Sequence, residues 1–331
     1  MTFAIRPIVG TKKNSIPILY LDTCVMLELA KYANDKCTDS HKNEIGELFC
    51  LLPQLMKAGK ILCPSGNQLQ EMGMSRGRKV AKEFLLHFTN CSLESPYNIK
   101  EAELAIGYQA FISQNLWIGL NEDIIWEEDT TPASRFRVHL SPIYSQEKLE
   151  SLKATKSNIV DGLNAAKRSG RIEKNWDNQL ISEQLTDFFL AYHSLSPQSN
   201  FELSEGRVID EIKAFRNRTG FWMQSLCDIP DEAVNVYFRF LQSSYHHNLP
   251  FQRIEAVLWA HLMQRSNNIA PGDRLDVLWA AAYLPFVDFA VTDSAFCRLL
   301  TESGLAEFYG TKVYAMRNLQ ELIDELHVVT D

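Results

Sequence analysis

Apolar residues near the end of the chain recur at two different spacings, which predict a helix and then a strand. Four of them lie three or four positions apart, on one face of a helix: Leu275, Leu278, Trp279 and Ala282. Leu284-Pro285 follows, and a proline disfavours helical geometry in the residue before it, so the helix is expected to stop there. The run Phe289-Ala290-Val291 is short and wholly apolar, as in a buried parallel strand.

Two earlier stretches repeat the pattern of a short apolar run followed by polar residues. The run from Pro17 to Leu21 predicts a first strand. The helix after it is indicated by apolar residues at helical spacing, namely Val25, Met26, Leu29 and Ala33. The run from Lys60 to Cys63 predicts a second strand, and Pro64 opens the polar turn behind it. The order of these elements favours an α/β fold with a parallel sheet.

The same spacing predicts helices elsewhere in the chain. One covers Ile45 to Leu55 and ends at Ala58-Gly59-Lys60. Another runs from Val80 to Phe88, and a further one from Ile254 to Leu262. The long stretch between residues 96 and 249 reads as mostly helical, with amphipathic segments over 104–112, 149–156, 180–192 and 234–241.

An acidic residue accompanies each predicted strand. Asp22 follows the first strand, Glu71 lies behind the second, and Asp293 ends the third, while Asp276 lies in the first turn of the helix before it. Open α/β sheets bind ligands at the carboxyl ends of their strands, so these acids could converge in one crevice. Two unit charges 4 Å apart repel by about 4 kcal/mol at an effective dielectric near 20. Such a cluster therefore requires a divalent metal or protons.

The order of the acidic motifs resembles that of the PIN-domain nuclease family. The family pattern is an acid after the first strand, a glutamate after the second, and two aspartates around a helix–strand unit that ends in Val-Thr-Asp or a near variant. Asp22-Thr23 and Val291-Thr292-Asp293 match it well. The resemblance implies a three-layer α/β/α fold with a parallel central sheet, built from residues 1–95 and 250–331, and an α-helical insertion of residues 96–249.

The resemblance also implies a metal-dependent nuclease. Its catalytic residues, which would bind Mg²⁺ or Mn²⁺, would be Asp22, Glu71, Asp276 and Asp293. Carboxylate oxygens suit these ions, which activate water and stabilise the leaving oxygen of a phosphodiester. Thr23 and Thr292 would orient those carboxylates or a bound water through their hydroxyls. The expected substrate is single-stranded RNA or another single-stranded nucleic acid, and the insertion is a possible surface for a protein partner.

The chain departs from the family pattern around its last two aspartates. The family often has an acid two residues after the strand's threonine, where this chain has Ser294, so Asp293 must serve instead. Asp273 competes with Asp276 for the third position. Alternatively, Asp273 is an N-cap and Asp276 faces the positive end of the helix dipole. Asp288 reads as a turn residue before its strand.

The overall charge bears on the substrate. The formal net charge is −8, which counts mildly against a nucleic-acid binder, although a carboxylate site adds negative charge of its own. A polyanionic substrate would need a local positive surface. Such a surface is predicted shortly after Glu71, from Arg76, Arg78, Lys79 and Lys82. A second basic cluster, Lys167-Arg168 with Arg171 and Lys174, reads as a solvated helix end.

The cysteine pattern and the absence of long apolar runs predict a soluble cytoplasmic protein. The seven cysteines include no Cys-x-x-Cys pair and are odd in number, which suits free thiols in a reducing compartment. No signal peptide and no apolar run long enough to span a bilayer are evident. His246-His247 has no partner spacing for a metal and reads as a solvated loop, whereas His261 on an apolar helix face reads as a core histidine.

Two other functions fit parts of the pattern. A degenerate PIN-like core with its insertion could be a non-catalytic protein-interaction module, although acids at all four positions argue against it. A phosphatase of the haloacid-dehalogenase type also begins with an aspartate after its first strand. That chemistry needs Asp-x-Asp, whereas this chain has Asp22-Thr23-Cys24. The oligomeric state is left open.

Overall fold

The computed structural model describes residues 16–37, 40–66, 68, 87–93, 95–114, 125–127, 160–161, 164–165, 167–168, 239–240 and 243–330. The strands are β1 (Leu19–Leu21), β2 (Pro64–Ser65), β3 (Cys91–Leu93), β4 (Ile125–Glu127), β5 (Phe289–Thr292) and β6 (Lys312–Ala315). The helices are α1 (Thr23–Ala33), α2 (Lys42–Lys57), α5 (Pro96–Ser113), α10 (Ser244–His247), α11 (Pro250–Gln264), α12 (Asp273–Tyr283), α13 (Ser294–Glu302), α14 (Leu305–Tyr309) and α15 (Leu319–Thr330), with a 3-10 turn at Met316–Asn318.

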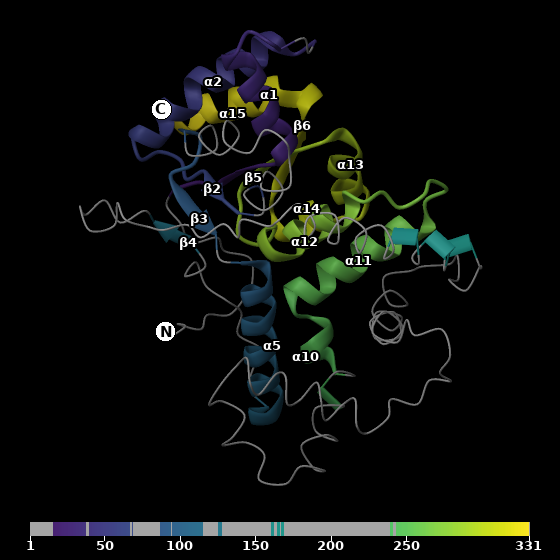
Figure 1. Cartoon of the computed structure of the whole chain (residues 1–331). Helices are drawn as coiled ribbons and strands as arrows, with labels where there is room; N and C mark the ends of the chain where they lie inside the picture. Colours follow the sequence, from purple (N-terminus) through teal and green to yellow (C-terminus); the bar gives the residue numbers. More distant parts are fainter. Residues whose placement is uncertain are drawn as a thin grey trace, which may run out of the picture.

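The central sheet is parallel and has the strand order β1-β5-β6 (Figure 1). A second sheet pairs β2 with β3 in parallel and β3 with β4 antiparallel. Ile18 forms a parallel bridge with Leu62, two residues before β2, so the second sheet continues from the outer edge of β1. The predicted mixed α/β class with a parallel sheet is confirmed, although β6 was not predicted and the second predicted strand belongs to the other sheet.

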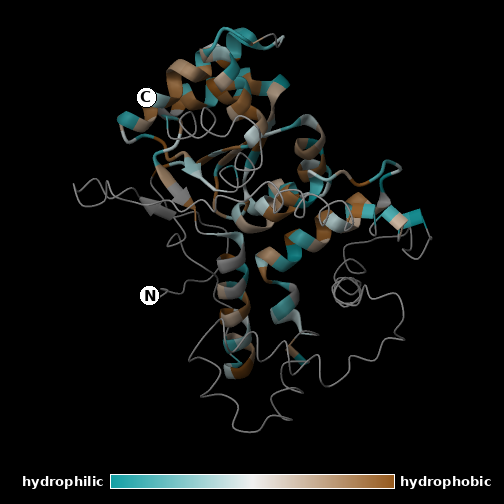
Figure 2. Cartoon of the chain, in the orientation of Figure 1, coloured by the Kyte–Doolittle hydropathy of each residue, from teal (hydrophilic) through white to brown (hydrophobic). Residues whose placement is uncertain are grey.

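Helices pack on both faces of the central sheet and bury β1 and β5 on both sides. Leu19 and Leu21 of β1 point into a hydrophobic cluster formed with α1, α2 and α15. Tyr20, between them, points the other way, into a cluster formed with α5, α11, α12, α13 and α14. Figure 1 shows α1, α2 and α15 gathered at one end of the molecule, and Figure 2 shows apolar and polar sides on these same helices.

Most of the predicted local elements are confirmed, with their boundaries set by caps. Asp22 caps α1, and a glycine in the left-handed region, Gly59 at φ 66°, follows α2. The predicted helix through Trp279 is α12, and the run after it is β5. Ala33 was expected on the apolar face of α1, but it is exposed at the last position of that helix.

Aromatic stacking fixes α12 against the sheet. The rings of Tyr20 on β1 and Trp279 on α12 are stacked with centroids 4.7 Å apart, and Tyr283 lies 5.8 Å from Tyr20. The ring of Phe296 on α13 packs edge-on against Trp279, with centroids 5.6 Å apart. All four side chains are buried, so α12 and α13 are packed together against β1.

The second predicted strand is displaced. Only Leu62 of the predicted run makes a bridge, and the strand itself is Pro64–Ser65, where a turn was expected. Asp288 lies in a bend directly before β5, as expected of a turn residue. In addition, its Oδ2 accepts the backbone N–H of Ile18 at 2.9 Å and links the start of β5 to β1.

Both histidine interpretations also require correction. His246 was expected in a solvated loop, but it lies in α10 with 7% of its surface exposed and its ring 5.4 Å from that of Phe240. His261 was expected in the core, but it is only half-buried on α11. Burial together with the nearby charge of Arg265 lowers the pKa of His261.

The start of the predicted insertion packs directly on the rest of the chain. α5 contacts both α11 and α12, and its Ile99 belongs to the same hydrophobic cluster as Tyr20. The division into 1–95, 96–249 and 250–331 stays a prediction. The predicted helices over 80–86, 149–156 and 180–192 and most of 234–241 lie outside the described residues. The cysteines of the described part are free thiols, and none of its helices is both long and apolar enough to cross a bilayer.

Candidate active site at the carboxyl end of the sheet

Asp22 lies where β1 ends and α1 begins, and it is almost fully buried. Its Oδ1 accepts the backbone N–H of Thr23 at 2.6 Å, which caps α1. Its Oδ2 accepts the Thr292 hydroxyl at 3.0 Å and the Cys24 thiol at 3.4 Å. Only 6% of Asp22 is exposed, so three donors from two elements define its orientation.

The protonation of Asp22 is set by opposing effects. Burial, the largest effect, raises its pKa, because the carboxylate loses hydration. The hydrogen bonds from Thr292, Thr23 and Cys24 stabilise the charged form and lower the pKa, while the negative charge of Asp293 raises it again. Asp22 and Asp293 therefore lie within electrostatic reach of each other.

Asp293 occupies the equivalent position on the neighbouring strand. It follows β5 and caps α13, with Oδ1 accepting the backbone N–H groups of Ala295 at 2.7 Å and Phe296 at 3.0 Å. Within the described part of the chain, its Oδ2 accepts no hydrogen bond, and the residue is only half-buried. The free oxygen is therefore available to a ligand, whereas Oδ1 holds the helix.

Asp273 is the third aspartate of this region. Its Oδ2 accepts the backbone N–H of Ala270 at 2.6 Å, so it reaches back across the helix start and is not itself the N-cap. Burial raises the pKa of Asp273, the nearby Arg265 and Lys167 lower it, and the charge of Asp293 raises it. Asp276 is half-buried in the same helical turn, and its Oδ2 lies 3.8 Å from the position that a Cβ on Gly272 would take.

Two further side chains at this site were not predicted. The thiol of Cys24 donates to Asp22, and burial strongly raises its pKa, so it is a neutral donor and not a thiolate. Gln68 is completely buried; its Nε2 donates to the carbonyl of Leu21 at 2.7 Å and its Oε1 accepts the N–H of Gly66 at 2.6 Å. Nothing in the local sequence around Gln68 distinguishes it from a surface amide.

The other predicted site residues are only partly located. The contribution of Thr23 that the structure shows is its backbone N–H on Asp22. Glu71 and the basic residues Arg76, Arg78, Lys79 and Lys82 lie outside the described residues. Gln68, three positions before Glu71, is the last described residue of this segment, and it lies against the end of β1.

The carboxylates suit a hard divalent cation in chemistry, but those described do not complete a site. Across the described ranges, no three His, Cys, Asp or Glu side chains are grouped so that they could hold a metal ion. The free Oδ2 of Asp293, the adjacent Asp22 and the mutual repulsion of their charges are features that Mg²⁺ or Mn²⁺ would satisfy. A further acid is required, and Glu71 is the predicted one.

Comparisons with known proteins give no relative from which a function could be transferred. No family model, no curated protein sequence and no solved structure matches this chain.

Proposed function

We propose that this protein is a metal-dependent nuclease of PIN-like fold that hydrolyses phosphodiester bonds in single-stranded RNA. The observation that carries the proposal is the pairing of Asp22 and Asp293. They end two adjacent parallel strands, and the charge of one raises the pKa of the other. Two carboxylates at the carboxyl ends of adjacent parallel strands would supply two ligands to a cation at the position where such sheets bind ligands.

The residues around this pair favour a preorganised site. Thr292 and Cys24 each donate to Asp22 Oδ2, which fixes the carboxylate without neutralising it. Asp293 is rigid because two backbone N–H groups of α13 hold its Oδ1. Gln68 brings the segment that leads to Glu71 against the end of β1. An acid from that segment could therefore join the pair.

In this proposal Asp22, Glu71 and Asp293 hold Mg²⁺ or Mn²⁺, together with Asp276 or Asp273 from the first turn of α12. The bound ion would activate water and stabilise the leaving oxygen of the phosphodiester. Thr292 orients Asp22, and Thr23 supplies a backbone N–H to the same carboxylate. The basic residues after Glu71 would contact the phosphate backbone.

Cleavage of single-stranded RNA in the presence of Mn²⁺ tests the proposal. Asp22→Asn and Asp293→Asn keep the size of each side chain but remove its charge. Outer-shell partners alone change metal affinity or activity by about 10–100-fold, so loss of a direct ligand should reduce cleavage by about a hundredfold or more. Asp324→Asn is the matched control, because Asp324 is exposed on α15. Equal cleavage by all four proteins would refute the assignment.

A non-catalytic interaction module of the same fold is the second candidate. It is favoured by one observation: within the described ranges no three potential ligands are grouped for a metal. A thermal shift with Mn²⁺ separates the two, because a ligand at a hundred times its Kd stabilises the native state by about 2.7 kcal/mol. The nuclease predicts a rise in Tm that Asp293→Asn diminishes, whereas the interaction module predicts no rise.

A further inference from the structure

The described residues between 160 and 168 divide into a buried set and an exposed set. Val160 and Asn164 are buried and Lys167 is half-buried, while Asp161, Ala165 and Arg168 are exposed. Each set is spaced by four and then three residues, as on one face of a helix, and the two sets are offset by one position, about 100°. Val160 belongs to the same hydrophobic cluster as Tyr20 and Trp279. These residues are thus part of the core, although they come from the middle of the predicted insertion.

Asn164 forms two hydrogen bonds with the connection between α11 and α12. Its Nδ2 donates to the carbonyl of Ile269 at 3.1 Å, and its Oδ1 accepts the N–H of the same residue at 2.8 Å. Ile269 has only 3% of its surface exposed and Asn164 only 7%, so neither backbone group of Ile269 can rely on water. The pairing satisfies two buried polar groups of a connection that has no secondary structure of its own.

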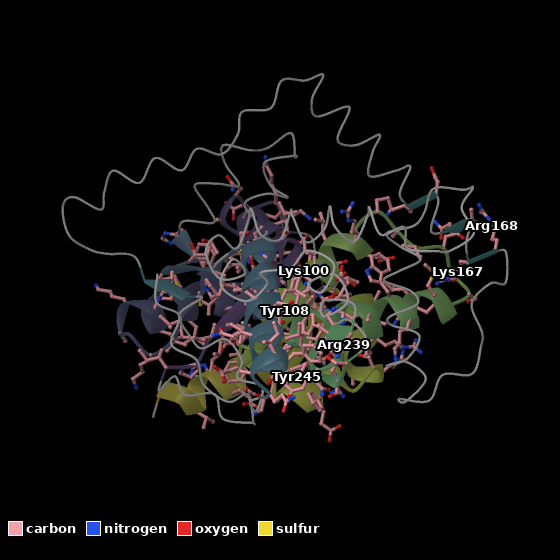
Figure 3. The ribbon with its side chains drawn as sticks, turned by 90° about the horizontal axis from the view of Figure 1, so that it is seen from below. Lys100, Tyr108, Lys167, Arg168, Arg239 and Tyr245 are labelled. Carbon is pink, nitrogen blue, oxygen red and sulfur yellow. The ribbon has the colours of Figure 1, made fainter. Side chains whose placement is uncertain are left out.

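Lys167 forms hydrogen bonds with the end of α11 and with the start of the same connection. Its Nζ donates to the carbonyl of Leu262 at 2.8 Å and to that of Asn267 at 2.5 Å. Leu262 lies in the last turn of α11, where carbonyls lack helical partners and a positive charge is favourable. Arg168 lies further out at the margin of the molecule (Figure 3), and the helical pieces of this segment lie at one end of α11 (Figure 1).

The connection held in this way leads directly into the first turn of α12. Ala270, next to Ile269, donates its N–H to Asp273 Oδ2 at 2.6 Å. We propose that Asn164 and Lys167 are positioning residues, which fix the α11–α12 connection and thereby the first turn of α12, which carries Asp273 and Asp276. The importance of that placement for metal binding rests on the proposed function, whereas the hold on the connection does not.

Hydrogen exchange at single amides of the full-length protein tests whether Asn164 and Lys167 stabilise the α11–α12 connection. Asn164→Ala removes the acceptor of the Ile269 amide, and loss of one hydrogen bond should speed exchange there about fivefold. If the connection transmits the change, exchange at the Ala270 amide rises as well. Lys167→Met keeps the aliphatic stem and should act in the same direction, so the test survives if Asn164→Ala fails to fold. Arg168→Met, one position along, should leave both amides unchanged.

The Mn²⁺ concentration at half-maximal Tm rise supplies the second readout. We expect it to increase about tenfold in Asn164→Ala and Lys167→Met, as for loss of an outer-shell partner, and not in Arg168→Met. Faster exchange at Ile269 without any change at Ala270 would overturn the positioning role. So would an unchanged Mn²⁺ concentration at half-maximal Tm rise in the two variants, if the wild-type Tm rises with Mn²⁺. If Mn²⁺ does not raise the Tm of the wild type, the proposed function fails. Exchange at the Ala270 amide alone then decides whether Asn164 and Lys167 fix the α11–α12 connection.

Discussion

Glu103 on α5 is an acid that the proposed site does not use. Its Oε2 accepts the N–H of Phe251, the second residue of α11, at 2.8 Å, while the N-cap residue Leu249 offers no side-chain acceptor. Glu103 thus supplies from another helix what an N-cap side chain normally supplies. Its Oε1 is buried and has no hydrogen-bond partner among the described residues, and burial raises the pKa of Glu103 to about 8.

Glu103→Gln should remove a pH dependence of stability. The folded pKa of about 8 lies above the ordinary value of 4.5, so the folded state binds the extra proton. The stability of the wild type should be full below about pH 4.5 and should fall as the pH rises through 8. Tyr309 and Arg253 lie nearby; burial first, and then the Glu103 charge, raises the pKa of Tyr309.

The measurement is urea unfolding at pH 5 and pH 9. At pH 9 the glutamine variant should be more stable than the wild type by about 4 kcal/mol, and at pH 5 the two should differ by less than about 1 kcal/mol. Glu307→Gln, an exposed change on α14, is the control and should show no such difference. A variant that loses stability at both pH values would mean that the carboxylate is needed as the cap.

Single substitutions can also distinguish the two aspartates of α12 as candidate metal ligands. The sequence ranked Asp276 above Asp273 as the third acid, whereas in the structure the charge of Asp293 reaches Asp273 and raises its pKa. We therefore expect Asp273→Asn to reduce the Mn²⁺-dependent rise in Tm more than Asp276→Asn does. Asparagine retains an oxygen for the Ala270 N–H, so that hydrogen bond, worth about 1 kcal/mol, should survive. A larger reduction in Asp276→Asn than in Asp273→Asn would restore Asp276 as the third ligand.

Among the elements, α5 packs closely against the start of α11. A Cβ on Gly107 would lie 2.6 Å from Cδ2 of Leu249, which is completely buried. Gly107→Ala should therefore destabilise the fold by about 1–3 kcal/mol through overpacking. The double variant Gly107→Ala/Leu249→Ala should be less destabilised than the sum of the two single changes.

Gly272→Ala is the control for this contact. Gly272 has helical torsion angles, φ −69° and ψ −41°, and its nearest neighbour to an added Cβ is 3.8 Å away. Alanine there should be neutral or slightly stabilising. Thermal unfolding of the variants checks both expectations, and strict additivity in the double variant would argue against direct contact.

On the scale of the whole molecule, the net charge of −8 opposes the approach of a polyanion. The basic residues after Glu71, which lie outside the described residues, are predicted to compensate locally. Substituting Arg76, Arg78 and Lys79 together should weaken RNA binding without changing sequence preference, because phosphate contacts carry no base information. If all three contact phosphates, the slope of log affinity against log salt should flatten by about 2 units.

A salt titration of RNA binding by the Asp293→Asn variant, with and without the three substitutions, measures that slope. Arg168→Met is the control, because Arg168 is exposed and lies in the other basic cluster. An unchanged slope would place the substrate path elsewhere. Lys167 is a poor substitute for that role, since its Nζ already donates to two backbone carbonyls.

The sequence by itself determined the elements whose signals are local. β1, β5, α1 and α12 follow from apolar runs and helical spacing, and Asp22 and Asp293 could be identified because each directly follows a buried strand. Parallel pairing then places both acids at one edge of the sheet, so half of the predicted four-acid set is located by periodicity and strand direction.

Only the tertiary structure decided which side chains hold these elements in place. Thr292 reaches Asp22 across 270 positions, and Asn164 reaches Ile269 across 105. Gln68 and Glu103 are buried amide and acid groups with ordinary local surroundings in sequence. Their roles depend on which backbone groups the fold leaves without partners, and such groups become apparent only when distant segments are packed together.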